Sequence, residues 1–178
     1  MKRVVTLLLA VVALAAVGAG SASAAAPLTL GTGWTKFYWD ATGETDPAGG
    51  YQVTSADVFT IKMTDSYVVG DAFDLYDGGS LVLSTPSVPK TGVDVIDDDA
   101  DAAYASPLYS HGYVTLLPGT HNLTINIRER ALDGTGAVIS GGGAFIRADA
   151  GTIPEPHSLL LLGMGLAGGA LALRRRSA

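Results

Sequence analysis

The densest group of side chains that could do chemistry is an acidic stretch in the second half of the chain. Five aspartates lie within eight residues: Asp94, Asp97, Asp98, Asp99 and Asp101. Calcium takes several oxygen ligands from a flexible loop, so this stretch is the candidate for a calcium site. It lacks the spaced glycine and the terminal glutamate of an EF-hand. Because runs of like charge usually face solvent, we favour a solvated acidic loop and assign no metal ligand.

Two further groups of polar side chains are weaker candidates for metal ligands. Asp71, Asp74 and Asp77 form a second calcium candidate, but we expect them to be turn residues or to lie on the outward face of a strand. His111 and His121 are lone histidines, and such residues are more often structural or exposed than ligands. No cofactor is therefore predicted.

The motifs of the common catalytic classes are missing from the sequence. The chain has no cysteine and so no thiol nucleophile. The adjacent Ser110 and His111 do not make a triad, which needs an orienting acid supplied by the fold. There is no G-x-S-x-G elbow, no H-E-x-x-H and no phosphate-binding loop. We predict that the protein is not an enzyme.

Aromatic residues gather near the start of the central region: Trp34, Phe37, Tyr38, Trp39 and Tyr51. Exposed rings of this kind stack on sugars, whereas buried rings are core. Trp34 and Phe37 compared with Trp39 have mixed parity, so one side of the cluster can lie outside. We favour the core for most of them.

The elements that must position these residues follow a β pattern. Alternating or aromatic-rich segments predict strands at 33–39, 57–63, 67–69, 72–76, 80–83, 113–117, 121–128 and 144–147. Asp77-Gly78-Gly79 predicts a tight hairpin turn. Inward positions are Phe59, Ile61 and Met63 in one strand and Leu123, Ile125 and Ile127 in another.

No segment between the two ends shows a convincing helical period. The sequence therefore predicts an all-β domain at 25–150, an antiparallel β-sandwich that is jelly-roll-like. This domain must hold together without disulfides. Residues 25–155 carry six basic and 17 acidic side chains, a formal net charge of −11. Such a surface excludes nucleic acid and anionic lipid as partners.

The N-terminus has the three parts of a secretory signal peptide. Lys2 and Arg3 are followed by an apolar segment at 4–17 and then by small residues, Ala22-Ser23-Ala24. We predict a signal peptide at 1–24 that signal peptidase removes after Ala24, with Ala26 as the second choice.

The C-terminus has a different tripartite pattern at 151–178. Pro154-Glu155-Pro156 precedes an apolar, glycine-rich segment at 158–173, and Arg174-Arg175-Arg176 follows. A helix over 158–173 would be roughly 24 Å long, which is slightly short for a full bilayer. We expect a single transmembrane helix that spans the inner membrane transiently, with the arginines in the cytoplasm.

This tail resembles the PEP-CTERM sorting signal of exopolysaccharide-producing Gram-negative bacteria. The resemblance implies that Pro154, Glu155 and Pro156 are the recognition motif for an exosortase, which would cleave nearby and remove the helix. The stretches at 70–79, 109–112 and 117–121 also resemble hairpin and loop sequences of other PEP-CTERM ectodomains. Such ectodomains supply no known activity.

The resulting expectation is an exported surface or extracellular-matrix protein with a structural or binding role, associated with exopolysaccharide in a biofilm matrix. It would pass through an inner-membrane-anchored intermediate and then reach the outer surface or the medium. Two alternatives remain open. One is a secreted carbohydrate-active hydrolase, which needs paired carboxylates across a cleft. The other is a calcium-dependent adhesion module.

Overall fold

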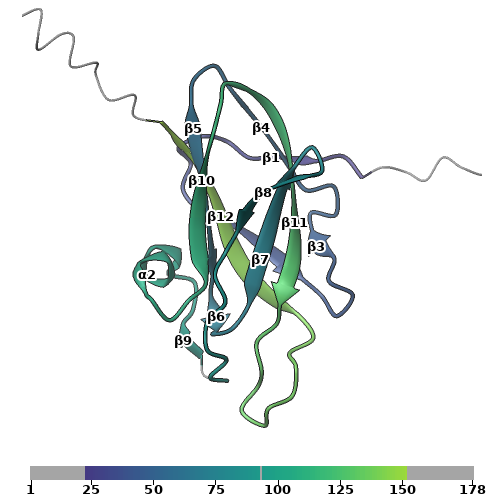
Figure 1. The fold of residues 1–178 in the computed structure, drawn as a ribbon, viewed down its shortest axis with the longest axis vertical. Coiled ribbons are helices and arrows are strands. Elements are labelled where there is room, and N and C mark those ends of the chain that lie inside the picture. The colour runs from purple at the N-terminus through teal and green to yellow at the C-terminus, as the bar shows by residue number, and fades with distance from the viewer. Residues whose placement is uncertain (1–22, 93, 152–178) are drawn as a thin grey trace, which may run out of the picture.

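The computed structural model describes residues 23–92 and 94–151, and its elements are mostly strands (Figure 1). The strands are β1 (Ala26–Pro27), β2 (Thr35–Trp39), β3 (Thr45–Asp46), β4 (Tyr51–Ser55), β5 (Phe59–Asp65), β6 (Tyr67–Val68), β7 (Ala72–Asp77), β8 (Ser80–Ser84), β9 (Asp94–Ile96), β10 (His111–Leu116), β11 (Gly119–Glu129) and β12 (Gly142–Ala150). One helix, α2 (Ala100–Ala105), lies between β9 and β10.

Two five-stranded sheets pack face to face as a sandwich. One sheet has the order β1-β4-β11-β7-β8 and the other the order β10-β5-β12-β2-β3, while β6 and β9 form a separate pair. The named strands pair antiparallel except β1 and β4, which pair parallel over two residues at the sheet's end. The predicted β-sandwich is confirmed at this level.

Alternating apolar side chains build the core between the sheets. Phe59, Ile61 and Met63 of β5 are buried as predicted, and Leu123 and Ile125 of β11 face them from the other sheet. Ile127 is only partly buried, because β11 shifts register against β7 immediately after it.

The β7–β8 hairpin follows the predicted turn. Gly78 and Gly79 have φ angles of 54° and 85°. Positive φ at both central residues fits a type I′ turn, whose twist matches that of the flanking strands. The two glycines are therefore the residues that let β8 return beside β7.

The short helix α2 departs from the sequence expectation. It occupies part of the stretch expected to be an acidic loop, and the Asp99 side chain caps it by accepting a hydrogen bond from the Ala102 N–H at 3.0 Å. Six residues are too few to display a helical period in the sequence. Strand β4 was also missed.

The predicted signal peptide lies outside the described residues up to residue 22, and the predicted tail helix lies outside them entirely. In the part of the chain that the structure describes, no helix has the length and hydropathy needed to cross a membrane.

Candidate ligand-binding site

The predicted sorting and processing residues are mostly beyond the described ranges. Pro154, Glu155, Pro156, Ala22 and the arginines at 174–176 all lie there. Ala24 is described and exposed, two residues before β1 begins. Gly151, the last described residue, donates its N–H to the Val58 oxygen at 2.9 Å. The folded sheet thus extends to within three residues of Pro154.

The acidic stretch is engaged with basic and aromatic side chains. Asp98 accepts a hydrogen bond from the Lys36 ammonium at 2.8 Å and another from the Tyr67 hydroxyl. The Lys36 hydrogen bond, then that of Tyr67, lowers the pKa of Asp98. Asp98 therefore connects the β9–α2 segment to the sheet containing β2.

Asp101 makes the second connection between α2 and the same sheet. It accepts a hydrogen bond from the Trp34 indole at 2.8 Å and pairs with Arg147 at 3.1 Å. The Arg147 guanidinium also lies 4.6 Å from the centre of the Trp34 ring. The aspartate that resembled a metal ligand thus has protein donors as partners.

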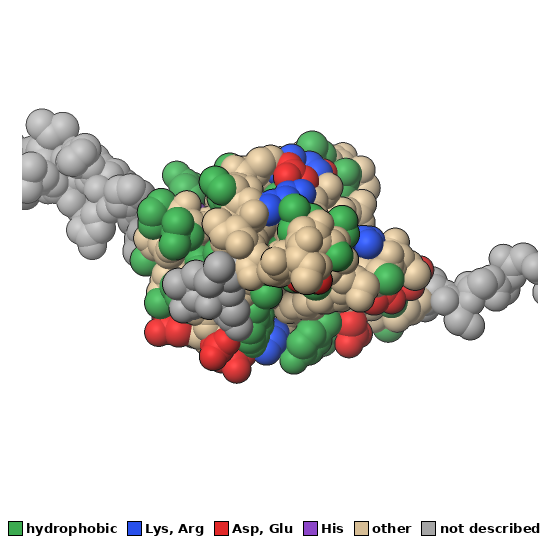
Figure 2. Space-filling view, turned by 90° about the horizontal axis from the view of Figure 1, so that it is seen from below, with side chains coloured by type: hydrophobic (Ala, Val, Ile, Leu, Met, Phe, Trp, Pro, Cys, Tyr) green, Lys and Arg blue, Asp and Glu red, His purple; other side chains and the backbone are tan. Residues whose placement is uncertain are grey.

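The remaining acidic candidates occupy different positions in the chain. Asp97 is exposed, Asp99 caps α2, and Asp94 begins β9. Among the described residues, no group of three or more His, Asp or Glu side chains is arranged to hold a metal ion. Figure 2, seen from below, shows acidic side chains at several separate places near the margins of this end of the molecule.

The second aspartate group separates into different environments. Asp77 pairs with His121 at 2.6 Å, and Asp74 lies 3.4 Å from the Arg128 guanidinium. Burial lowers the pKa of His121, but the hydrogen bond to Asp77, the hydrogen bond to the Leu117 backbone oxygen and the charge of Asp77 together outweigh it, so the net shift is upward. The expectation of turn or outward positions was wrong for Asp71, which is only 4% exposed.

Asp71 lies close to another buried carboxyl group, Asp65, which the sequence did not single out. Asp71 accepts hydrogen bonds from the Ala131 N–H at 2.7 Å and the Trp39 indole at 3.1 Å. Asp65 accepts from the backbone N–H groups of Asp71 and Gly70, each at 3.2 Å. Burial raises the pKa of Asp71 to about 6. Burial, together with the charge of Asp71, raises that of Asp65 to about 8.

The two candidate histidines have separate local partners. The Nδ1 atom of His111, on β10, lies 2.8 Å from the backbone carbonyl oxygen of Tyr109. The centre of its ring lies 5.1 Å from the centre of the Tyr104 ring. His121, on β11, belongs to the other sheet and packs edge-on against Phe59. Nothing in their spacing along the chain had indicated that they would come together.

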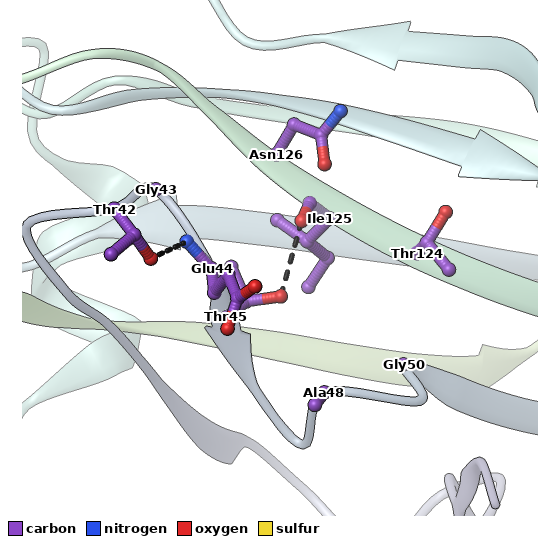
Figure 3. Close-up of a pocket in the computed structure, with 9 residues that line it drawn as sticks. All are labelled: Thr42, Gly43, Glu44, Thr45, Ala48, Gly50, Thr124, Ile125 and Asn126. Atoms are coloured by element: carbon purple, nitrogen blue, oxygen red, sulfur yellow. Dashed lines mark hydrogen bonds between the residues drawn. The ribbon is translucent and has the colours of Figure 1, made fainter. Parts of the chain in front are cut away.

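A hollow lies between the 42–50 segment and β11. Its volume is about 460 Å³, and its polar lining includes Thr42, Glu44, Thr124 and Asn126. Thr45 fixes the segment against β11 by donating its hydroxyl to the Ile125 oxygen at 3.1 Å (Figure 3). We name it the β11 hollow; its hydroxyl, amide and carboxylate groups suit a ligand that both donates and accepts hydrogen bonds.

Two further hollows lie on either side of Tyr38. The first, the Gly143 hollow, has a volume of about 410 Å³ and is lined by Lys36, Tyr38, Trp39, Tyr67, Gly142 and Gly143. The second, the Asp46 hollow, has a volume of about 220 Å³ and is lined by Tyr38, Trp39, Asp40, Glu44, Thr45, Asp46 and Ala48. Tyr38 is 53% exposed, whereas Phe37, Trp39 and Tyr51 are buried. The aromatic cluster is therefore mostly core, with Tyr38 as the ring that strand parity turns outward.

A smaller cavity adjoins the Gly143 hollow from inside. It has a volume of about 100 Å³ and shares Trp39, Tyr67, Gly142 and Gly143 with that hollow. Asp71 reaches its wall. This volume is well below the roughly 300–1,000 Å³ of typical ligand pockets. Neither Asp65 nor Asp71 therefore lines a described hollow that is large enough for a sugar.

The comparisons with known proteins identify only the tail. Residues 152–176 match the protein family described as the PEP-CTERM protein-sorting motif. No curated protein and no solved structure matches the chain. The protein therefore carries a PEP-CTERM sorting motif, which implies export, processing by an exosortase and sorting to the cell surface. The recognition made from the tail sequence is confirmed.

Proposed function

We propose that this protein is a non-catalytic, polysaccharide-binding component of the cell surface or extracellular matrix. The sorting motif supplies the route. The observation that carries the binding role is the exposed ring of Tyr38, which separates two hollows bordered by hydrogen-bonding groups. After tail removal the protein stays with exopolysaccharide at the outer surface or in the biofilm matrix.

The strand order supports a jelly roll as the finer description of the sandwich. The eight longer strands pair in a nested series: β2 with β12, β4 with β11, β5 with β10 and β7 with β8. A long hairpin rolled around a core gives this nesting, in which the first strand meets the last. Jelly rolls occur among lectin domains, so the architecture is compatible with sugar binding without requiring it.

A carbohydrate-active hydrolase is the alternative that one observation favours. Asp40, Glu44 and Asp46 all border the Asp46 hollow. However, hydrogen bonds from the Thr42 hydroxyl and then its N–H lower the pKa of Asp40, whereas a glycosidase general acid needs a raised pKa. Asp65 and Asp71 have raised pKa values but are buried. The acid–base pairing of a glycosidase thus lacks support at the hollow that a sugar could enter.

The calcium-dependent adhesion alternative has less support. Asp98, Asp99 and Asp101 hold α2 and its neighbouring segment through protein donors. Calcium would have to displace those donors. The adhesion reading predicts a melting temperature that rises with added calcium.

The test combines location with binding. The chain with Pro154-Glu155-Pro156 intact and the chain with all three changed to Ala are expressed in a host that has an exosortase. Intact mass and cell fraction are measured, and the recovered protein is incubated with the host's exopolysaccharide. We expect trimming near Glu155, surface or medium location and polymer binding for the intact motif. An untrimmed tail in both forms, or no binding by the exported form, would refute the proposal, and release of reducing sugar would indicate the hydrolase.

A further inference from the structure

The Gly143 hollow and the Asp46 hollow meet at a single exposed tyrosine. Both are lined by Tyr38 and Trp39, and Tyr38 is the half-exposed member of that pair. A planar ring standing between two hollows is a stacking platform for the apolar face of a pyranose, with room on each side for the adjoining sugar units.

The β11 hollow continues the same path around the edge of the sandwich. It shares Glu44, Thr45 and Ala48 with the Asp46 hollow. Because Thr45 belongs to the edge strand β3, the three hollows follow one another past that edge, from the outside of β2 to the outside of β11. We call this path the edge groove. A groove of this form suits a polymer chain, which passes through, more than a small molecule, which is enclosed.

The wall of the groove beside Tyr38 includes two glycines whose backbone is approached closely by neighbouring side chains. A Cβ on Gly143 would stand 3.1 Å from Lys36 Cε, 3.4 Å from Tyr67 Cε2 and 3.5 Å from Tyr38 Cδ1. A Cβ on Gly142 would stand 2.9 Å from the Trp39 indole. Glycine at the start of β12 thus lets the Trp39, Lys36, Tyr67 and Tyr38 side chains pack close to the backbone at this wall of the groove.

The charges along the groove select the class of polymer. Asp40, Glu44 and Asp46 border its middle section, and Glu44 also borders the β11 hollow. Carboxylates accept hydrogen bonds from sugar hydroxyls but repel uronic acids, sulfate esters and phosphate esters. Lys36, the cation in the Gly143 hollow, is already paired with Asp98 at 2.8 Å. The groove therefore favours uncharged sugars.

We propose that the edge groove binds a neutral hexose polymer, with one sugar stacked on Tyr38 and its neighbours held by the hollows on either side. This deepens the proposed function, on which it rests, by naming the site and the polymer class.

The experiment measures the retardation of the exported protein in native gels containing either a neutral polymer (dextran, galactomannan or hydroxyethylcellulose) or the anionic polymer alginate. Tyr38→Ala is compared with Tyr113→Ala. Tyr113 is 65% exposed and lies on β10, at the opposite edge of the same sheet. Asn126→Ala probes the β11 hollow independently of the ring, and Asn122→Ala, on the same strand, is its control.

We expect at least one neutral polymer to retard the wild type and the Tyr113 variant, with apparent affinity about tenfold weaker for Tyr38→Ala, the factor that about 1.4 kcal/mol produces. Asn126→Ala should also weaken binding, and Asn122→Ala should not. Equal retardation of the wild type, Tyr38→Ala and Asn126→Ala would overturn the groove while polymer binding stands. Retardation by alginate alone would overturn the neutral class, and no retardation of the wild type by any polymer would overturn the proposed function itself.

Discussion

The buried pair Asp65 and Asp71 predicts an unusual dependence of stability on pH. Burial raises both folded-state pKa values, to about 8 and about 6, from 3.8 in the unfolded chain. Between these limits the unfolded state releases protons that the folded state keeps. The folded state binds more protons over this range, so the free energy of unfolding falls as pH rises. Below about pH 4 both states are protonated and the penalty disappears.

The size of the effect follows from the width of each window. One group with shifted pKa changes stability by about 1.4 kcal/mol per pH unit inside its window. Asp71 lowers the free energy of unfolding as pH rises from about 4 to about 6. Asp65 does so over a wider range, from about pH 4 to about pH 8. The nearby charges of Lys90 and Arg130 already moderate the Asp71 shift. We expect a fall of several kcal/mol between pH 4.5 and 7.5, against a typical total stability of about 5–15 kcal/mol.

The assay is urea unfolding of the exported protein, followed by tryptophan fluorescence, at half-unit steps of pH in about 0.5 M salt. Salt at that level screens the repulsion among surface carboxylates but not the buried pair. Asp71→Asn should flatten the slope, even if its baseline stability drops because an amide cannot accept both hydrogen bonds. Asp97→Asn removes an exposed charge and should leave the slope unchanged. Stability that is level or rising from pH 4.5 to 7.5 would refute the buried-charge reasoning.

Three further outcomes follow from local geometry. Gly142→Ala should lower the melting temperature by about 4 °C or more, because the new Cβ would meet the buried Trp39 indole at 2.9 Å; thermal unfolding measures this. Asp101→Ala should cost about 1 kcal/mol and speed amide hydrogen exchange in α2, because it removes an indole hydrogen bond and an ion pair. N-terminal sequencing of the exported protein should read from Ala25, because the Ala26 N–H donates a hydrogen bond to the Gly50 oxygen at 2.9 Å and cleavage after Ala24 keeps it. A start at Pro27 would contradict this, since residue 26 and its hydrogen bond would be lost.

The two substitutions each have a matched comparison. Gly143→Ala meets the flexible end of Lys36 at 3.1 Å and should leave the melting temperature nearly unchanged, so equal losses in both glycine variants would contradict the packing argument. Asp97→Ala removes an acidic side chain near α2 but leaves the hydrogen bond between Trp34 and Asp101 in place. If amide exchange in α2 speeds up equally in the Asp97 and Asp101 variants, the role given to Asp101 is contradicted.

The sandwich was predictable from the sequence where apolar and polar residues alternate over several positions. In β5 and β11 apolar residues occupy every second position, and a strand with one face on the core requires that spacing. The Gly78-Gly79 turn was predictable for a similar reason, since few other residues adopt its backbone angles. In contrast, α2 depends on contacts made by Asp101 to Trp34, 67 positions earlier, which no local pattern encodes.

The candidate site was predictable only in its composition. The aromatic cluster at 34–39 was visible, and its mixed parity indicated that one side of it could lie outside. In the structure Phe37 and Trp39 are buried, whereas Tyr38 is exposed and Trp34 is partly buried. The Gly143 hollow and the β11 hollow were not visible, because the first forms between β2 and the start of β12 and the second between the 42–50 segment and β11, which are far apart in the sequence. The burial of Asp71 was likewise hidden, since a residue before a strand looks the same whether the fold covers it or not.

Strand β12 connects the proposed groove to the sorting tail. It begins at Gly142 and Gly143, which form part of the groove wall beside Tyr38, and ends at Ala150, just before the matched motif. At about 3.3 Å per residue its nine residues separate the two ends by roughly 26 Å. Gly151, the last described residue, therefore lies at the opposite end of this strand from the Gly143 hollow. Processing at the tail would thus act on the chain beyond the end of β12 that is remote from Tyr38, which fits the proposal that trimming and polymer binding are independent events.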